Sequence, residues 1–119
     1  MNGTVHATND DAPIACDLTA MSAEERAEHS RVAEEVLASA KEPRERPGGY
    51  AFRLPTETDL IQKAGSFISR ERRCCPFFHF TLDVEPDHGP AWPSVTGREG
   101  VKQFLRESLL PRLGIETME

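Results

Sequence analysis

Apolar residues recur at helical spacing in three stretches of the chain. In the first stretch, Val32, Val36 and Ala40 fall on one side of a helix. The second stretch covers residues 60–68 and the third covers residues 101–109. The spacing therefore predicts three amphipathic helices, each with one face directed at a core.

Each helical stretch follows a Ser or Thr that lies three residues before an acidic residue. In a capping box, the hydroxyl and the carboxylate each satisfy a free backbone N–H at the start of a helix. The pairs are Ser22 with Glu25, Thr56 with Asp59, and Thr96 with Glu99. We therefore expect the first helix to run from Ser22 to about Lys41, and the other two to begin at the second and third pairs.

Two further segments alternate apolar and polar residues, as half-buried strands do. They are "GYAFRLP" at residues 49–55 and "FFHFTLDVE" at residues 77–85. A weaker third strand, "AWPSVTG" at residues 91–97, contains Pro93, which cannot donate a hydrogen bond to a neighbouring strand. We expect this strand at a sheet edge or a bulge. The segment "EPRERPGG" before the first strand is typical of a turn-rich connector.

The order of elements is α-β-α-β-β-α, which predicts an α+β fold with a small three-stranded sheet covered by helices. The helix between the first two strands favours a right-handed crossover and parallel pairing, and the third strand should return as a hairpin. The uncovered face or edge of the sheet would then form a homodimer. We expect a flexible tail at residues 1–13 and a single domain at residues 14–114.

Charge and composition narrow the possible functions of the 119-residue chain. Its 14 basic and 20 acidic residues give a net charge of −6, which argues against a broad nucleic-acid-binding face. No apolar run is long enough to span a membrane, and the N-terminus lacks the pattern of a secretory signal. We therefore predict a cytoplasmic protein. Three cysteines without an export signal do not indicate a disulfide framework.

The segment "RRCCPFFHF", residues 72–80, contains the chemistry that these patterns leave unexplained. Pro76 disfavours helical geometry in the residue before it, so the second helix must end near Cys75. A Cys74–Cys75 disulfide would close a small, strained ring. The other interpretations are that the two cysteines bind a metal ion or that they pack as small apolar side chains.

A metal site would need further ligands besides Cys74 and Cys75. Cys16 could supply a third sulfur, and His79 follows four residues after Cys75. Thiolates, with or without an imidazole, suit Zn(II), Cu(I) and Hg(II). Glu71 could orient a ligand, act as a base or form a salt bridge. No role is assigned to the other histidines, which are His6, His29 and His88.

The ionisation of the paired cysteines is subject to opposing effects. The three arginines at positions 70, 72 and 73 favour thiolate, whereas the dipole at a helix C-terminus disfavours it. The sequence does not decide between them. The arginine cluster itself is interpreted as the solvated end of a helix.

The chain resembles a group of small, largely uncharacterised bacterial proteins. The resemblance lies in "GYAFRLP", "ERRCCPFFHF" and "TGREGVKQFL", and in an Ala-Cys-x-Leu segment at residues 15–18. The hallmark of this group resembles Glu-Arg-x-Cys-Cys-Pro-Phe before a strand. The resemblance covers roughly residues 14–110 and implies a link to resistance against mercury or other metals. It also implies that Cys16 belongs with Cys74 and Cys75 as a three-thiol set.

Taken together, these observations predict a small thiol-based protein that binds a thiophilic metal ion (zinc, copper or mercury). Its ligands would be Cys16, Cys74, Cys75 and His79, and its role would be sensing, buffering or delivery. One alternative is a cysteine-dependent enzyme that acts on an organometallic or disulfide-type substrate, with Arg73 or His79 tuning the pKa of its cysteine. Another is a structural or dimeric interaction module with inert cysteines.

Overall fold

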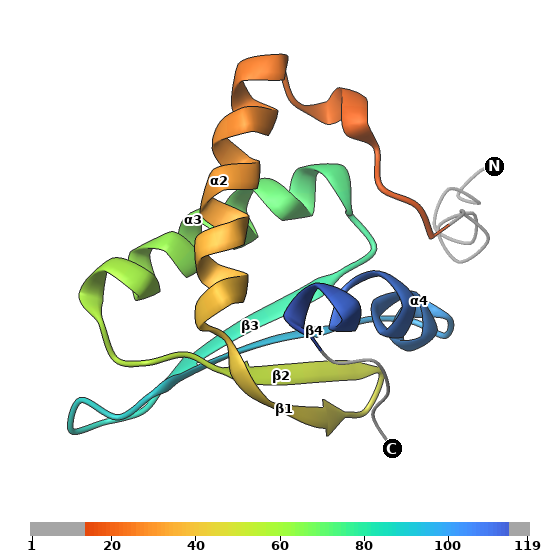
Figure 1. Ribbon diagram of the computed structural model, residues 1–119. Helices are drawn as coiled ribbons and strands as arrows, with labels where there is room; N and C mark the ends of the chain where they lie inside the picture. Colours follow the sequence, from red (N-terminus) through yellow and green to blue (C-terminus); the bar gives the residue numbers. More distant parts are fainter. Residues whose placement is uncertain (1–13, 115–119) are drawn as a thin grey trace, which may run out of the picture.

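The computed structural model describes residues 14–114, so the tail predicted at residues 1–13 lies outside the described residues. The fold is α+β, as predicted, and consists of α-helices on one side of a four-stranded antiparallel sheet (Figure 1). Among the described residues, no helix combines the length and the apolar character needed to cross a bilayer.

The described residues form three α-helices, two short 3-10 helices and four strands. The α-helices are α2 (Ala23–Ser39), α3 (Thr58–Cys74) and α4 (Val101–Ser108). The 3-10 helices are η2 (Leu18–Ala20) and η3 (Leu110–Leu113). The strands are β1 (Lys41–Arg46), β2 (Gly49–Arg53), β3 (His79–Val84) and β4 (Ala91–Thr96). The sheet therefore has one strand more than the three that the sequence pattern predicts.

The strands lie in the order β1-β2-β4-β3, and each neighbouring pair is antiparallel. β2 and β3 run in the same direction, as expected for two strands joined through a helix. However, β4 lies between them, so the predicted parallel pairing of these two strands is wrong. The hairpin between β3 and β4 is confirmed.

β4 is a central strand despite its proline, so its predicted place at an edge is wrong. Its ladder with β2 pairs Val95 with Tyr50 and Ser94 with Ala51. The next contact is an isolated bridge between Leu54 and Ala91. The ladder between β2 and β4 is therefore interrupted at Pro93, which has no N–H to donate to the neighbouring strand.

β1 occupies the segment that the sequence pattern assigns to a connector. Five of its six residues are exposed, so it has no apolar alternation that could have revealed it. It is an edge strand, and its register shifts between Lys41 and Arg44, a stretch that contains Pro43. The Arg44 guanidinium lies 3.9 Å from the centre of the Trp92 ring, and this cation–π contact fastens β1 to the sheet.

Only the first of the three predicted helix caps is present. Ser22 Oγ accepts a hydrogen bond from Glu25 N, and Glu25 Oε1 accepts one from Ser22 N, at 3.1 and 3.0 Å. The Thr56 hydroxyl instead donates to the Gly89 carbonyl, and α3 begins without a side-chain cap. α4 begins after Gly100, whose φ of +99° suits a residue without a Cβ.

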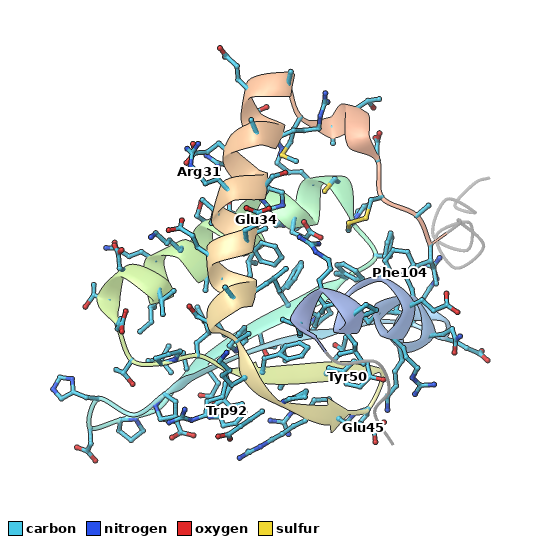
Figure 2. The ribbon with its side chains drawn as sticks, viewed as in Figure 1. Arg31, Glu34, Glu45, Tyr50, Trp92 and Phe104 are labelled. Atoms are coloured by element: carbon cyan, nitrogen blue, oxygen red, sulfur yellow. A yellow bond between two sulfur atoms is a disulfide. The ribbon has the colours of Figure 1, made fainter. Side chains whose placement is uncertain are left out.

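The main core fills the space between the sheet and the helices. Its buried residues are Val32, Val36, Ala40, Tyr50, Phe52, Leu54, Ala64, Ala91, Val95, Val101, Leu105 and Leu110. The Tyr50 ring is fully buried and points toward α4, where its hydroxyl accepts a hydrogen bond from Arg106 Nε at 3.3 Å (Figure 2). The core therefore draws its residues from every helix except η2, and from the two central strands.

A second, smaller group of buried residues lies at the C-terminal end of α3. It consists of Met21, Cys74 and Cys75, and we call it the cysteine cluster. The rings of Phe77 and Phe78 pack against it, and both also contact the main core. The cysteine cluster is thus an extension of the core toward the N-terminal segment.

Candidate thiol site

The two adjacent cysteines mark the end of α3, as predicted. Cys74 is the last helical residue, and the backbone of Cys75 has left the helical region with φ −126° and ψ 69°. Pro76 accounts for this change, because its ring disfavours helical geometry in the preceding residue. The N–H of Cys75 still donates to the Glu71 carbonyl at 2.8 Å, so Glu71 lies one turn before the cysteines.

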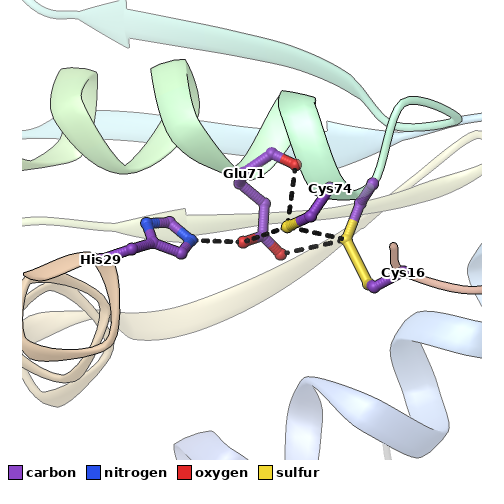
Figure 3. A network of polar contacts seen from close by, with 5 residues as sticks. Cys16, His29, Glu71 and Cys74 are labelled. Carbon is purple, nitrogen blue, oxygen red and sulfur yellow. Dashed lines mark hydrogen bonds and ion pairs between the residues drawn. A yellow bond between two sulfur atoms is a disulfide. The ribbon is translucent and has the colours of Figure 1, made fainter. Parts of the chain in front are cut away.

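Cys75 forms a disulfide bond with Cys16, and their Cα atoms are 4.7 Å apart (Figure 3). This pairing differs from the expectation that the cysteines do not form disulfides. It also differs from the Cys74–Cys75 alternative, because the sulfurs of those two residues are 3.9 Å apart and Cys74 is a free thiol. Cys16 is exposed, whereas Cys75 is completely buried.

Hydrogen bonds hold the N-terminal segment against the end of α3. The N–H of Asp17 donates to the Cys74 carbonyl at 2.6 Å. The guanidinium of Arg73 donates to the Ala20 carbonyl at 2.9 Å and to Glu25 Oε2 at 3.1 Å. Arg73 therefore links α3 to both the N-terminal segment and α2, and this docking brings Cys16 to Cys75.

The carboxylate of Glu71 contacts both cysteines of the pair. Its Oε2 lies 3.5 Å from Cys75 Sγ, and its Oε1 lies 3.9 Å from Cys74 Sγ. Glu71 is three residues before Cys74 on α3 and four before Cys75, whose N–H still bonds to the Glu71 carbonyl, so the helical spacing brings its carboxylate to both cysteines. The carboxylate is therefore the group around which the sulfurs are arranged.

His29 is the fifth residue of the site, although the sequence analysis assigned it no role. Its Nε2 lies 2.7 Å from Glu71 Oε1 (Figure 3). The residue is 7% exposed, and its ring stacks on Phe67, with 5.3 Å between ring centres. A proton on Nε2 would make the imidazole a donor to the carboxylate. α2 therefore contributes a buried imidazole to the site from 42 residues upstream of Glu71.

Burial raises the pKa of the Cys74 thiol above its ordinary value, and the negative charge of Glu71 raises it further. The thiol also donates to the Glu71 carbonyl, with 3.6 Å between sulfur and oxygen. The causes of the raised pKa are thus burial and neighbouring carboxylates, and not the arginines or the helix dipole that the sequence analysis set against each other. Cys74 is consequently a thiol at neutral pH.

Two sets of potential metal ligands share Glu71. One set is Cys16, Glu71 and Cys75, and the other is His29, Glu71 and Cys74; in each set the ligand atoms lie within 4.8 Å of one another. Disulfide sulfurs lack the negative charge of the thiolates that bind metals. These donors therefore suit a borderline or soft metal ion once the disulfide has been reduced.

The fourth ligand predicted from the sequence, His79, lies elsewhere. It is the first residue of β3, it is exposed, and it is paired with Thr96 of β4. Neither of the two ligand sets found among residues 14–114 includes it. The structure thus brings the three predicted cysteines together but places a different histidine beside them.

Comparisons of the chain with known protein families, curated proteins and solved structures find no match. The resemblance to bacterial proteins with a Glu-Arg-x-Cys-Cys-Pro-Phe motif therefore stays a prediction.

Proposed function

We propose that the reduced protein binds a soft or borderline metal ion through the thiolates of Cys16, Cys74 and Cys75. The observation that carries this proposal is the arrangement of three sulfurs beside Glu71. Two of the sulfurs are bonded to each other, and the third lies 3.9 Å from Cys75 Sγ. Thiolate donors suit Zn(II), Cu(I) and Hg(II), and the role would be sensing, buffering or delivery.

Reduction of the Cys16–Cys75 disulfide is the step that makes the site able to bind a metal ion. Two electrons and two protons convert the disulfide into two thiols, and metal binding then displaces the protons. After reduction, the Asp17–Cys74 backbone hydrogen bond and the contacts of Arg73 still hold the N-terminal segment. Cys16 would therefore stay close to Cys75, so that little chain ordering opposes metal binding.

The remaining ligand would come from Glu71 or a histidine. His29 is favoured over His79, because His29 already touches Glu71 while His79 belongs to neither ligand set among the described residues. Metal binding and thiolate formation would also relieve the charge conflict between Glu71 and Cys74, because a cation would lie between the two negative groups.

The homodimer and the cytoplasmic location predicted from the sequence remain part of the proposal. β3 is an edge strand whose last residue, Val84, is 48% exposed, and this strand offers the surface for pairing with a second copy.

The two alternative functions differ in the reactivity that they require of the cysteines. A cysteine enzyme would need a reactive thiol, and an interaction module would need none.

Metal titration of the reduced protein tests the proposal. The metal-free chain would be kept under a phosphine reductant without oxygen and titrated with Cd(II), whose thiolate complexes absorb in the ultraviolet. We expect one tightly bound ion per chain, and much weaker binding by the Cys74→Ser variant. Unreduced wild-type protein is the control and should bind weakly. Equal binding by the reduced and oxidised proteins would contradict the proposal.

A matched pair of histidine variants identifies the auxiliary ligand. His29→Ala should weaken Cd(II) binding at least about 10- to 100-fold, the usual effect of losing even an outer-shell partner of a ligand. His79→Ala should leave binding unchanged, since this side chain lies outside both ligand sets. The reverse result would restore the ligand set predicted from the sequence.

A further inference from the structure

An apolar cavity adjoins the thiol site and is not needed for metal binding. It has a volume of about 140 Å³ and lies between the helices and the sheet. Its aromatic lining consists of Phe52, Phe67, Phe78, Phe80 and Phe104, and its lining also includes Cys16 and Glu71. The cavity therefore combines an apolar interior with a disulfide sulfur and a carboxylate.

The size of the cavity limits what it can hold. An apolar cavity of about 150 Å³ engineered in another protein stays free of water and binds benzene. A cavity of similar volume accommodates one six-membered ring or a short alkyl chain. Apart from Glu71, Ser108 and Arg112, its lining is apolar and disfavours a charged ligand, because moving an ion from water into apolar surroundings is costly. The ligand is consequently a small, neutral, apolar group.

We propose that this cavity binds small aromatic thiols and that the bound thiol exchanges with the Cys16–Cys75 disulfide. The ring would occupy the cavity, and the thiol would face Cys16, the disulfide member that lines it. This inference goes beyond metal binding and does not depend on it, since it concerns the oxidised protein. It assigns a substrate class to a disulfide that would otherwise only stabilise the fold.

The exchange is balanced without any further oxidant or reductant. The S–H bond of the ligand breaks, and the proton passes to the carboxylate of Glu71. The ligand sulfur bonds to Cys16 Sγ while the bond between Cys16 and Cys75 breaks. Cys75 leaves as a thiolate and takes the proton from Glu71, whose Oε2 is 3.5 Å away. The products are a mixed disulfide on Cys16 and a free Cys75 thiol.

The charge around the disulfide explains why the thiol must enter in its neutral form. The Glu71 carboxylate touches Cys75, so it repels an approaching thiolate but can accept a proton from a thiol. The hydrogen bond from His29 holds the other carboxylate oxygen in place. Glu71 thus acts as the proton carrier between the incoming sulfur and the leaving sulfur.

Exchange rates with two thiols of similar acidity test the proposal. Oxidised, metal-free protein would be treated in the presence of a chelator with phenylmethanethiol or with 2-mercaptoethanol. We expect phenylmethanethiol to open the disulfide at least about tenfold faster, because only its ring gains from burial. Its rate should also saturate with concentration. Acid quenching and intact mass give the rate, and peptide mapping should locate the adduct on Cys16.

Blocking the cavity supplies the control. Ala64→Leu places a larger side chain in the cavity wall and should abolish the preference for phenylmethanethiol, while the rate with 2-mercaptoethanol stays unchanged. Toluene in the wild-type protein should slow only the aromatic thiol, and this measurement decides the question even if the variant does not fold. Equal rates for the two thiols, or no effect of toluene, would overturn the proposal.

The rate of a Glu71→Gln variant at different pH values tests the role of Glu71 separately. Glu71→Gln should slow the reaction with phenylmethanethiol about 100-fold at pH 7, the usual scale of acid–base catalysis. At a pH above the pKa of the ligand thiol, the variant should no longer be slower, because no proton has to be removed and the repulsion is gone. An equal rate at pH 7, or an adduct on Cys75, would show that Glu71 does not carry the proton as proposed.

Discussion

The main core and the cysteine cluster are both buried, but different interactions hold them together. The main core combines residues from six helices and strands, and its stability depends on how well they pack. The cysteine cluster joins the N-terminal segment to the end of α3 through one disulfide and a few hydrogen bonds. The comparison teaches that the cysteine cluster depends on a covalent bond that a reductant can break, whereas the main core contains no cysteine.

Truncation in the main core should have the largest effect. Leu105 is 2% exposed, and Leu105→Ala removes packing atoms that its neighbours cannot replace. We expect the free energy of unfolding in urea to fall by about 2–5 kcal/mol. The loss should be the same with and without reductant. A loss that appears only under reductant would show that the two regions are not separate.

Removal of the disulfide should have the next largest effect. Cys16→Ser opens a covalent loop between residues 59 positions apart, which should lower the free energy of unfolding by about 2–4 kcal/mol. Reductant should lower the stability of the wild-type protein by a similar amount and should not affect the variant. Cys74→Ser is the matched control, because it removes a sulfur and keeps the disulfide. Reductant sensitivity in the Cys16→Ser protein would contradict the pairing.

Loss of the α2 cap should have a smaller effect at the boundary between the two regions. Ser22→Ala removes the acceptor for the N–H of Glu25 and should cost about 1 kcal/mol. Ser30→Ala, at an exposed position within the same helix, is the control and should be neutral or slightly stabilising. Both variants should remain sensitive to reductant. Equal losses in the two variants would argue against the cap.

The dependence of stability on pH should be the smallest effect. The pKa of Cys74 is raised in the folded protein, so the folded state holds its proton at a pH where the unfolded state has released it. The free energy of unfolding should therefore be unaffected below the ordinary thiol pKa of 9.0 and decrease as the pH rises above it. Denaturation of the oxidised protein at several pH values measures this slope.

Two variants separate the causes of that slope. Cys74→Ser should remove the part of the pH dependence that comes from the Cys74 thiol. Glu71→Gln should lower the pKa of Cys74 only part of the way to its ordinary value, since burial is the larger cause. Thiolate absorbance in the ultraviolet follows this titration, because Cys74 is the only free thiol among the described residues of the oxidised protein. An unchanged pKa in Glu71→Gln would show that the carboxylate charge does not act on this sulfur.

The elements that depend on local pattern could be predicted from the sequence. The three helices, the three patterned strands and the end of α3 before Pro76 follow from periodicity and proline geometry. β1 could not be found in this way, because it is exposed on nearly all positions and carries no alternation. The central place of β4 was missed because the effect of Pro93 depends on where the neighbouring ladder is interrupted.

The thiol site was predictable only in part, for a similar reason. Glu71 lies at helical spacing from Cys74 and Cys75, and this spacing could have identified it as their neighbour. The approach of His29 depends on the packing of α2 against α3, for which the sequence gives no local signal. The choice of Cys16 as the partner of Cys75 likewise depends on the docking of the N-terminal segment.

The disulfide also converts residues 16–75 into a closed covalent ring that contains α2, β1, β2 and α3. A protease that cuts once in the exposed edge strand, for example after Arg44, opens this ring without releasing a fragment. The piece that carries α2 stays attached to the piece that carries the rest of the sheet. Such a nicked molecule would migrate as one chain on a gel until a reductant divides it into two.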